Sequence, residues 1–199
     1  MEILDLNEDP FLEFKKWFET AGQQSSISYP EAMCVSSVGE DGYPQSRYVL
    51  MKEYSPEGFV FYTNFNSNKG KSILFCPKVA LNFYWMPLDQ QVRIRGDVQP
   101  VDDSQADGYF STRSRRSQLG AWASDQSAEL GSREELIARL EELELKFKGQ
   151  KVERPPWWRG FIVKPISFQF WEQRDNRLHD SFLYQQRDEA GWKISRRNP

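Results

Sequence analysis

The sequence predicts a mainly β protein with α-helices at its periphery, built as a closed or partly closed antiparallel barrel. Two observations carry this prediction. Short runs rich in β-branched and aromatic residues, separated by turn sequences, occupy residues 31–101 and again 161–196, and a helical stretch at about 102–148 lies between them. Strands on both sides of a helical excursion must pair to cover one core. We therefore expect a single domain over residues 1–199, with the helices outside the barrel.

The first part of the chain predicts one helix and three strands. Asp9 and Pro10 suit the N-cap and the first position of a helix over residues 10–21. Its apolar face recurs at helical spacing and should dock on the barrel; it consists of Phe11, Phe14, Trp17 and Phe18. The runs that follow predict strands at 31–38, 44–54 and 59–64, joined by the turns "GEDGY" and "SPEG".

The central part predicts a short helix, two more strands and then a change to helical periodicity. A helix fits residues 67–75 and is stopped by Pro77, and strands fit residues 79–86 and 91–101. Residues 102–123 look helical. Ser132 and Glu135 form a capping box for an amphipathic helix, whose apolar positions are Leu136, Leu140, Leu143 and Phe147.

The last part begins with a linker rich in helix and strand breakers, "GQKVERPPWWRG". Four short strands are expected to close the barrel: "FIVKP", "SFQFWEQ", "SFLYQQR" and "WKISR".

Composition narrows the class of protein. The formal net charge is −3, which gives no global attraction to nucleic acid, and no apolar run is long enough for a membrane span. The acidic start "MEILDLNEDP" is unlike a signal peptide, so we expect a cytoplasmic protein. Cys34 and Cys76 lack a metal-binding or redox spacing and are expected to be buried reduced thiols. With one histidine in the chain, we expect no metal site.

A first candidate phosphate site lies in "YFSTRSRRSQLG". On one continuous helix, Tyr109, Arg113 and Ser117 would lie at i, i+4 and i+8 on one face. A guanidinium flanked by hydroxyl donors suits a phosphate. The alternative is an ordinary solvated basic face, and Arg115 and Arg116 are expected to point to solvent.

A second candidate phosphate site combines "SRYVLMKEY" with "FYTNFNSNKGK". Its basic side chains lie near a predicted helix start, which favours an anion; they are Arg47, Lys52, Lys69 and Lys71. Strand periodicity would place Arg47 and Lys52 on opposite faces unless the strand bulges or the ligand wraps around its end. The alternative is a set of edge lysines that discourage strand pairing.

The stretch "FWEQRDNRLHDSF" contains the only histidine of the chain. On a strand, Arg177 and His179 would point to one side and Asp180 to the other. A structural histidine and a ligand-facing one both stay open on spacing alone. Because no catalytic triad, P-loop or dinucleotide motif is present, an enzyme of this sequence would need a cofactor for its chemistry.

Several motifs together resemble one family, the pyridoxine (pyridoxamine) 5'-phosphate oxidases. They run in the family's order along nearly the whole chain: "DPFLEFKKWF", "SRYVLMK", "FYTNFNSNKGK", "FYWMPLDQQVRIRG", "YFSTRSRRSQLGAWASDQS", "PPWWRGF", "FWEQRDNRLHD" and "WKISRRNP". The resemblance implies an FMN-binding split β-barrel that forms a homodimer, with FMN in clefts at the subunit interface.

The resemblance also implies roles for individual residues. The implied FMN-binding set is Arg47, Val49, Leu50, Met51, Lys52, Tyr62, Thr63, Lys69, Gln91, Gln126, Ser127 and Trp171. The substrate phosphate would be bound by Lys52, Tyr109, Arg113 and Ser117. Arg177 and His179 would be the catalytic-site residues, with Arg177 positioning and polarising the substrate and His179 orienting it.

The implied reaction is hydride transfer from substrate C4' to flavin N5, followed by reoxidation with O2 to give H2O2. A phosphorylated B6 vitamer, pyridoxamine or pyridoxine 5'-phosphate, would yield pyridoxal 5'-phosphate. Two alternatives stay open: an oxidase of another reduced ring, as in phenazine biosynthesis, and a non-catalytic protein that binds flavin or pyridoxal phosphate.

The chain departs from the family at two FMN-binding positions. Asn68 and Ser181 stand where the family usually has arginine, and the loss of both charge-assisted contacts would weaken FMN binding by a factor on the order of a hundred or more. Lys71 or an arginine of the partner subunit is a candidate substitute. The basic, tyrosine-bearing segment that covers the substrate in many members is expected to be absent, which would open the site.

Overall fold

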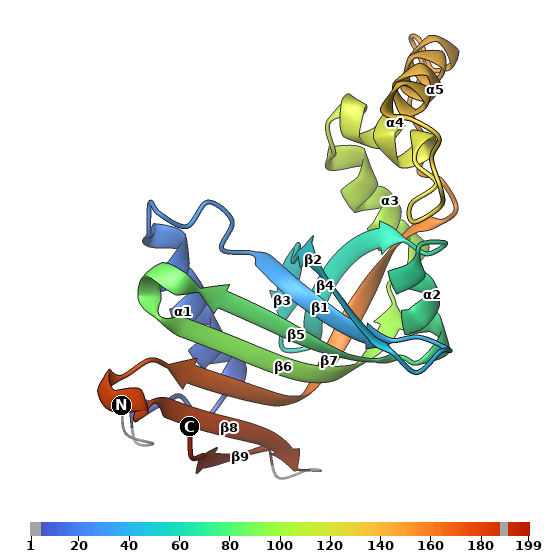
Figure 1. The fold of residues 1–199 in the computed structure, drawn as a ribbon. Coiled ribbons are helices and arrows are strands. Elements are labelled where there is room, and N and C mark those ends of the chain that lie inside the picture. The colour runs from blue at the N-terminus through green and yellow to red at the C-terminus, as the bar shows by residue number, and fades with distance from the viewer. Residues whose placement is uncertain (1–4, 188–190) are drawn as a thin grey trace.

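A curled antiparallel sheet forms the body of the protein in the computed structural model, which describes residues 5–187 and 191–199 (Figure 1). Within these residues the sheet has nine strands: β1 (Ala32–Val38), β2 (Pro44–Leu50), β3 (Glu53–Ser55), β4 (Gly58–Asn64), β5 (Lys78–Trp85), β6 (Gln90–Pro100), β7 (Trp158–Glu172), β8 (Asp180–Arg187) and β9 (Gly191–Arg196). Their order is β2-β1-β5-β6-β7-β4-β3, and β8 pairs with β7 and β9. The predicted pairing of early with late strands is confirmed.

Five α-helices are described: α1 (Pro10–Gln23), α2 (Asn68–Phe75), α3 (Asp103–Thr112), α4 (Arg115–Ala123) and α5 (Arg133–Lys146). As expected, α1 precedes the first strands, α2 lies between two strands, and α3 to α5 lie between the two groups of strands. Two short 3-10 turns, η2 (Met86–Leu88) and η3 (Asp175–Arg177), complete the described elements. The predicted N-caps Asp9 and Ser132 are confirmed, because each accepts a backbone hydrogen bond in the first turn of α1 and α5. Ser67, expected as the first residue of its helix, is the N-cap of α2. The return bond of the expected capping box differs, since Glu135 Oε2 accepts from Gly131 N rather than from Ser132 N.

Helix α1 fills the concave side of the sheet with aromatic rings. Phe14 is fully buried and contacts Phe59 and Phe83 edge-on, with ring centroids 4.9 and 5.1 Å apart. Trp17 meets Phe170 in the same way at 5.2 Å. Edge-to-face geometry adds to the large apolar area that such rings bury. This packing explains why the aromatic face predicted for residues 10–21 docks on the barrel.

The closing strands differ from the prediction in two respects. β7 begins at Trp158, so the last three residues of the expected linker "GQKVERPPWWRG" belong to the strand. "FIVKP" and "SFQFWEQ" belong to one strand, β7, because Pro165 lies at a bulge where the register against β6 shifts by one residue. There β7 changes its second neighbour from β4 to β8, so the missing N–H of Pro165 breaks no ladder. Gly96 faces this bulge, and a Cβ on it would lie 2.4 Å from Lys164 O.

Two other predicted elements divide in the structure. The strand expected at 44–54 is interrupted at Met51 and Lys52, which separate β2 from β3. The helical stretch 102–123 breaks at Arg113 and Ser114, where α3 ends and α4 begins with Ser114 as its N-cap. In both places the break lies beside the cavity described below.

Helices α3 to α5 project from one end of the barrel (Figure 1) and have a small core of their own. Its buried members are Phe110, Leu119, Val152 and Trp158. Arg115 is exposed but does not simply point to solvent, because its guanidinium donates to the backbone oxygens of Phe147 and Gln150. It thereby joins α4 to the end of α5.

Two remaining expectations concern the thiols and membrane crossing. Cys34 and Cys76 are free, and both are half-buried rather than buried as predicted. None of the helices within residues 5–187 and 191–199 combines the length and the apolarity that a membrane crossing needs.

Candidate functional site

A cavity of about 650 Å³ lies where β2 and β4 meet α3 and α4. Its lining residues are Arg47, Tyr48, Val49, Leu50, Lys52, Tyr62, Thr63, Asn64, Lys69, Tyr109, Arg113, Ser117, Gly120, Ala121, Ser124, Gln126 and Trp158. Four of these carry positive charge and none is acidic. Eleven of them are residues that the sequence singled out.

One end of the cavity holds Arg47 and Lys69. The Lys69 ammonium donates to Thr63 Oγ1 at 2.7 Å and also to Gln126 Oε1, and Arg47 Nη1 donates to Ser37 Oγ at 2.8 Å. Burial first, and the charge of Arg47 second, lower the pKa of Lys69 to about 8. Two partly desolvated cations that repel each other are stabilised by an anion placed between them. This end therefore suits a phosphate.

The other positively charged end is built around Arg113. Its guanidinium lies over the Trp158 ring, 4.6 Å from the centroid, and its Nη1 is buried without a hydrogen-bond partner among the described residues. Burial lowers the pKa of Arg113. A buried guanidinium nitrogen without an acceptor is costly, and an oxyanion ligand would satisfy it.

Tyr109, Arg113 and Ser117 line the same cavity, but not for the predicted reason. They do not share one helix face, because Tyr109 lies on α3, Ser117 on α4 and Arg113 at the junction between the two helices. The break turns α4 so that Ser117 still faces the cavity. Ser117 Oγ is hydrogen-bonded to Ser114 Oγ at 2.8 Å, which fixes its position.

Arg47 and Lys52 also reach the same cavity despite strand periodicity. The period of two ends with β2 at Leu50, and Lys52 follows outside a strand with its backbone N–H donating to Val60 O. Because the strand ends before Lys52, the alternation that would separate Arg47 from Lys52 no longer applies, and both residues line one cavity. The side chain of Lys52 makes no hydrogen bond within the described residues.

Stacked rings form one wall of the cavity. Tyr62 stacks on Tyr109 with centroids 4.2 Å apart and on Trp158 at 5.3 Å, with interplanar angles of 12° and 4°. The Tyr62 hydroxyl donates to Glu53 Oε1, and burial together with Glu53 raises the pKa of that hydroxyl. Stacking on Tyr62 fixes the position of the Tyr109 ring, and the Trp158 ring supports the guanidinium of Arg113.

Three residues of the predicted FMN-binding region lie close to the cavity without lining it. Met51 is buried in the core, so only its backbone is available. Ser127 lines an adjacent pocket of about 230 Å³ and accepts a hydrogen bond from the Asn68 backbone N–H. Lys71 lines that pocket too, but not the cavity that contains Arg47 and Arg113.

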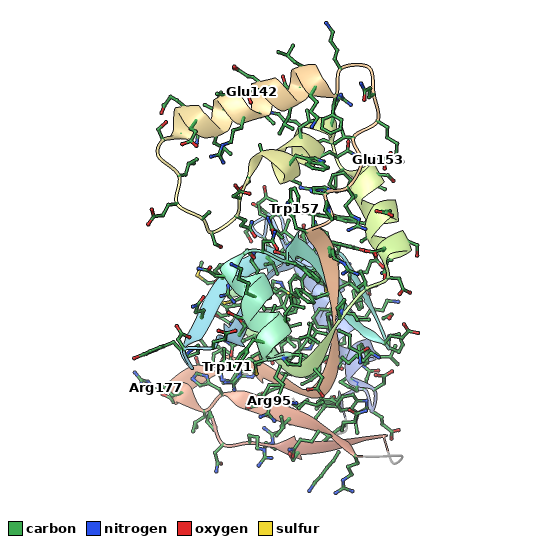
Figure 2. All side chains as sticks on the ribbon, turned by 90° about the vertical axis from the view of Figure 1, so that its right-hand side faces the viewer. Arg95, Glu142, Glu153, Trp157, Trp171 and Arg177 are labelled. Atoms are coloured by element: carbon green, nitrogen blue, oxygen red, sulfur yellow. The ribbon has the colours of Figure 1, made fainter. Side chains whose placement is uncertain are left out.

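The remaining predicted residues lie at the other end of the sheet. Gln91, Trp171 and Ser181 are neighbours across β6, β7 and β8. Trp158, which lines the cavity, and Trp171 are thirteen residues apart on β7, which corresponds to about 40 Å along the strand. Figure 2 shows Trp171 and Arg177 together on one side of the barrel, well away from Trp157 at the base of the helices.

The placement of Arg177 and His179 corrects the prediction of a strand. Arg177 lies in η3, inside the hairpin between β7 and β8, with φ at 61°, and His179 directly precedes β8. Arg177 is exposed and makes no hydrogen bond within the described part of the chain. The His179 ring lies 4.7 Å from the Trp171 ring.

Six residues that line the cavity were not singled out from the sequence: Tyr48, Asn64, Gly120, Ala121, Ser124 and Trp158. Trp158 is the most important of them, because it stacks on Tyr62 and supports Arg113. Its motif "PPWWRGF" was visible, but its position depends on the pairing of β7 with β4, in which Trp158 lies opposite Asn64.

The geometry defines a class of protein. A curled antiparallel sheet whose cavity has clusters of positive charge around Lys69 and around Arg113, together with one aromatic wall, suits a phosphorylated ligand. Comparisons with known proteins point the same way. Residues 20–147 match the family described as pyridoxamine 5'-phosphate oxidase, and residues 158–199 match the pyridoxine 5'-phosphate oxidase C-terminal dimerisation region.

Individual relatives agree over most of the chain. A protein of Myxococcus xanthus (strain DK1622) named pyridoxine/pyridoxamine 5'-phosphate oxidase is 49% identical over 93% of this chain and 89% of its own length. One of that name from Caulobacter vibrioides (strain NA1000 / CB15N) is 48% identical over 96% of this chain and 86% of its own. PhzG from Burkholderia lata 383, solved with tetrahydrophenazine-1-carboxylic acid, has a TM-score of 0.90 at 30% identity, covering 98% and 95% of the two chains. The chain belongs to the pyridoxine/pyridoxamine 5'-phosphate oxidase family, and its fold is the family's split barrel.

This family binds FMN, and the residues of the cavity fit that cofactor. The unpartnered Nη1 of Arg113 and the neighbouring cations Lys69 and Arg47 mark two places that an anion would stabilise. Those places suit the phosphates of two different ligands. Arg47, Lys69, Thr63 and Gln126 would hold the FMN phosphate.

Proposed function

We propose that this protein is an FMN-dependent oxidase that converts pyridoxamine 5'-phosphate or pyridoxine 5'-phosphate to pyridoxal 5'-phosphate. Its other substrate is O2 and its other product is H2O2. The observation that carries the proposal is the second phosphate-type end at Arg113, in the same cavity as the Arg47 and Lys69 end. A cavity for FMN alone needs one such end, whereas a cavity for FMN and a phosphorylated substrate needs two.

Bound FMN supplies the hydride acceptor and returns the electrons to O2. The chain's own residues bind and orient. Arg113 takes the substrate phosphate, with Tyr109 and Ser117 as neutral donors and Lys52 as a second cation. Fixing the phosphate limits the motion of the substrate, so that its reacting carbon is held at one place. The stacked wall of Tyr62, Tyr109 and Trp158 excludes water from one side.

We propose that each site is shared between two copies of the chain in a homodimer. Trp171 lies thirteen residues beyond Trp158 on β7, and Figure 2 shows it well away from Trp157 at the base of the helices, so we expect that one copy does not supply both groups of residues to one ligand. A second copy can supply Trp171, Arg177 and His179 to the cavity of the first. The match of residues 158–199 to a dimerisation region supports this arrangement.

A direct assay tests the function. Purified protein loaded with FMN is mixed in air with pyridoxamine 5'-phosphate, and pyridoxal 5'-phosphate and H2O2 are measured. Equal amounts of both products support the proposal. Bound FMN without turnover of either B6 substrate would leave a flavin-binding protein and sink the oxidase.

Complementation tests the shared site. Heterodimers with Arg113→Ala in one chain and Arg177→Ala in the other contain one intact site if the site is shared, because two-fold symmetry places the two changes together in the other site. We expect about half the wild-type activity, with each homodimeric variant far below that. A heterodimer no more active than its parents would contradict sharing.

The similarity to PhzG favours a second candidate, oxidation of a reduced phenazine-type ring on the same scaffold. Such a substrate carries a carboxylate instead of a phosphate. The two candidates are separated by comparing kcat/KM for pyridoxamine 5'-phosphate with that for tetrahydrophenazine-1-carboxylic acid. The Arg113 end favours the phosphorylated compound.

A further inference from the structure

The hairpin between β7 and β8 is held by a hydrogen-bond network around Arg174. Arg174 Nε donates to Asp180 Oδ2 at 2.9 Å, and its Nη2 bonds to Glu172. Arg196 Nη1 donates to the other oxygen of Asp180 at 2.6 Å. Burial alone would raise the pKa of Asp180, but hydrogen bonds, foremost those from Arg174 and Arg196, and nearby positive charge lower it to about 2, so this carboxylate stays charged. The arginine thus clamps both ends of the hairpin.

The same residue also contacts the histidine through its backbone. Arg174 N lies 3.1 Å from His179 Nδ1. A backbone N–H can only donate, so Nδ1 must accept and cannot carry a proton. The neutral ring then carries its proton on Nε2, which makes no hydrogen bond within the described residues. The Trp171 ring, tilted by 52° at 4.7 Å, supports the imidazole from one side.

The hairpin needs such support because its backbone is unusual. Asn176 and Arg177 follow each other with φ at 56° and 61°, a region that residues other than glycine rarely adopt. Without the side chain of Arg174, little else inside the hairpin holds residues 173–179 in this conformation: Leu178 N donates to Asp175 O and Gln173 N to Asp89 O.

We propose that Arg174 is a positioning residue of the active site, which fixes His179 as its Nε2–H tautomer. His179 therefore presents a hydrogen-bond donor to the ligand and does not act as a base through Nδ1. That His179 faces the substrate rests on the proposed function, whereas the tautomer and its dependence on Arg174 follow from the hairpin alone. The acceptor on the ligand is an oxygen or an unprotonated nitrogen of the bound ring.

The experiment is favoured by the composition of the chain, because His179 is its only histidine. Long-range proton–nitrogen NMR of ¹⁵N-labelled, FMN-loaded protein then reports on one ring without assignment. In mildly alkaline buffer we expect a protonated Nε2 and an unprotonated Nδ1. A protonated Nδ1 would overturn the tautomer.

Arg174→Ala tests the positioning role. We expect the two ring nitrogens to shift toward averaged values, as two tautomers exchange, and kcat/KM to fall on the order of tenfold or more, since small misplacements of a contacting group are costly. Arg174→Lys keeps a cation beside Asp180 and should restore part of both. The matched control is Arg197→Ala, which removes an exposed arginine outside the hairpin and should change neither.

The outcomes separate this inference from the proposed function. An Arg174→Ala protein with the wild-type tautomer and wild-type kcat/KM would overturn the role of Arg174. A wild-type protein with the expected tautomer but no turnover of B6 phosphates would sink the proposed function and leave the assignment of His179 standing.

Discussion

Replacement of Arg113 by alanine tests the assignment of the two phosphate-type ends. The guanidinium has one buried nitrogen without a partner and lies 4.6 Å from the Trp158 centroid, so it is already oriented and partly desolvated. A charge-assisted hydrogen bond contributes about 1.5 to 3 kcal/mol. Loss of even one such bond to the substrate phosphate should raise KM about tenfold to a hundredfold.

The effect should appear in KM more than in kcat, because the phosphate is held equally in the ground state and the transition state. FMN content, measured from the flavin absorbance of purified protein, should stay near wild type, since Arg47 and Lys69 lie at the other end of the cavity. Arg116→Ala is the matched control. Arg116 is an exposed arginine on α4 with no ion pair within the described residues, and its removal should leave KM unchanged.

One result would refute the reasoning. If Arg113→Ala loses FMN while the residual holoenzyme keeps its wild-type KM, the Arg113 end binds the cofactor phosphate and the two ends have been exchanged. A thermal melt of the variant keeps this outcome apart from unfolding, since loss of the ring contact alone should cost about 0.5 to 2 kcal/mol.

Three further predictions follow from the same structure. FMN affinity should be steady between about pH 7, where the FMN phosphate is already largely a dianion, and pH 8, and should fall above pH 8. The reason is that burial and the charge of Arg47 lower the pKa of Lys69 to about 8, and the neutral amine no longer attracts the phosphate. Fluorescence titration of apoprotein with FMN measures this, and a Lys69→Met protein with the same pH profile would exclude Lys69 as the cause. Gly96→Ala should lower the free energy of unfolding by about 1–3 kcal/mol, since the new Cβ would lie 2.4 Å from Lys164 O. Gly108→Ala is the control, because a Cβ at that position meets nothing within 4 Å. Equal melting temperatures of the two variants would contradict the bulge geometry. Asn68→Arg adds a cation at an exposed position beside the cavity and should tighten FMN binding about tenfold, and an unchanged dissociation constant would show that this position does not reach the phosphate.

Local features of the fold were predictable because local chemistry decides them. The N-caps at Asp9, Ser67 and Ser132 each satisfy a backbone N–H of their own first turn, so the sequence around them suffices. The continuity of β7 through Pro165 was not predictable, because it depends on an exchange of neighbouring strands far away in the sequence. Proline reads locally as a strand end, and only the complete sheet shows that its missing N–H is harmless there.

The site shows the same division between local and distant causes. The spacing correctly predicted that Tyr109, Arg113 and Ser117 lie together, although the helix breaks between them. Ser114, which caps α4, could have indicated that break. Trp158 was missed, because it reaches Arg113 only through the pairing of β7 with β4. The resemblance to a family supplied Trp171 and His179, and no spacing within one chain could have shown that they lie far from the cavity.

The row of neighbouring residues Gln91, Trp171 and Ser181 lies at the other end of the sheet from the cavity. This separation links cofactor binding to the association of two copies of the chain. In the proposed homodimer each FMN contacts both chains, so whatever FMN contributes to the complex also stabilises the dimer, and the coupling works equally in both directions. The two departures from the family fall on opposite sides of this contact. Asn68 borders the cavity of one chain, whereas Ser181 belongs to the row of the other, where it is buried and accepts a hydrogen bond from Gln169. An arginine introduced at the exposed Asn68 can therefore strengthen FMN binding without repacking, whereas one introduced at Ser181 would have to displace the buried side chain and its hydrogen bond from Gln169.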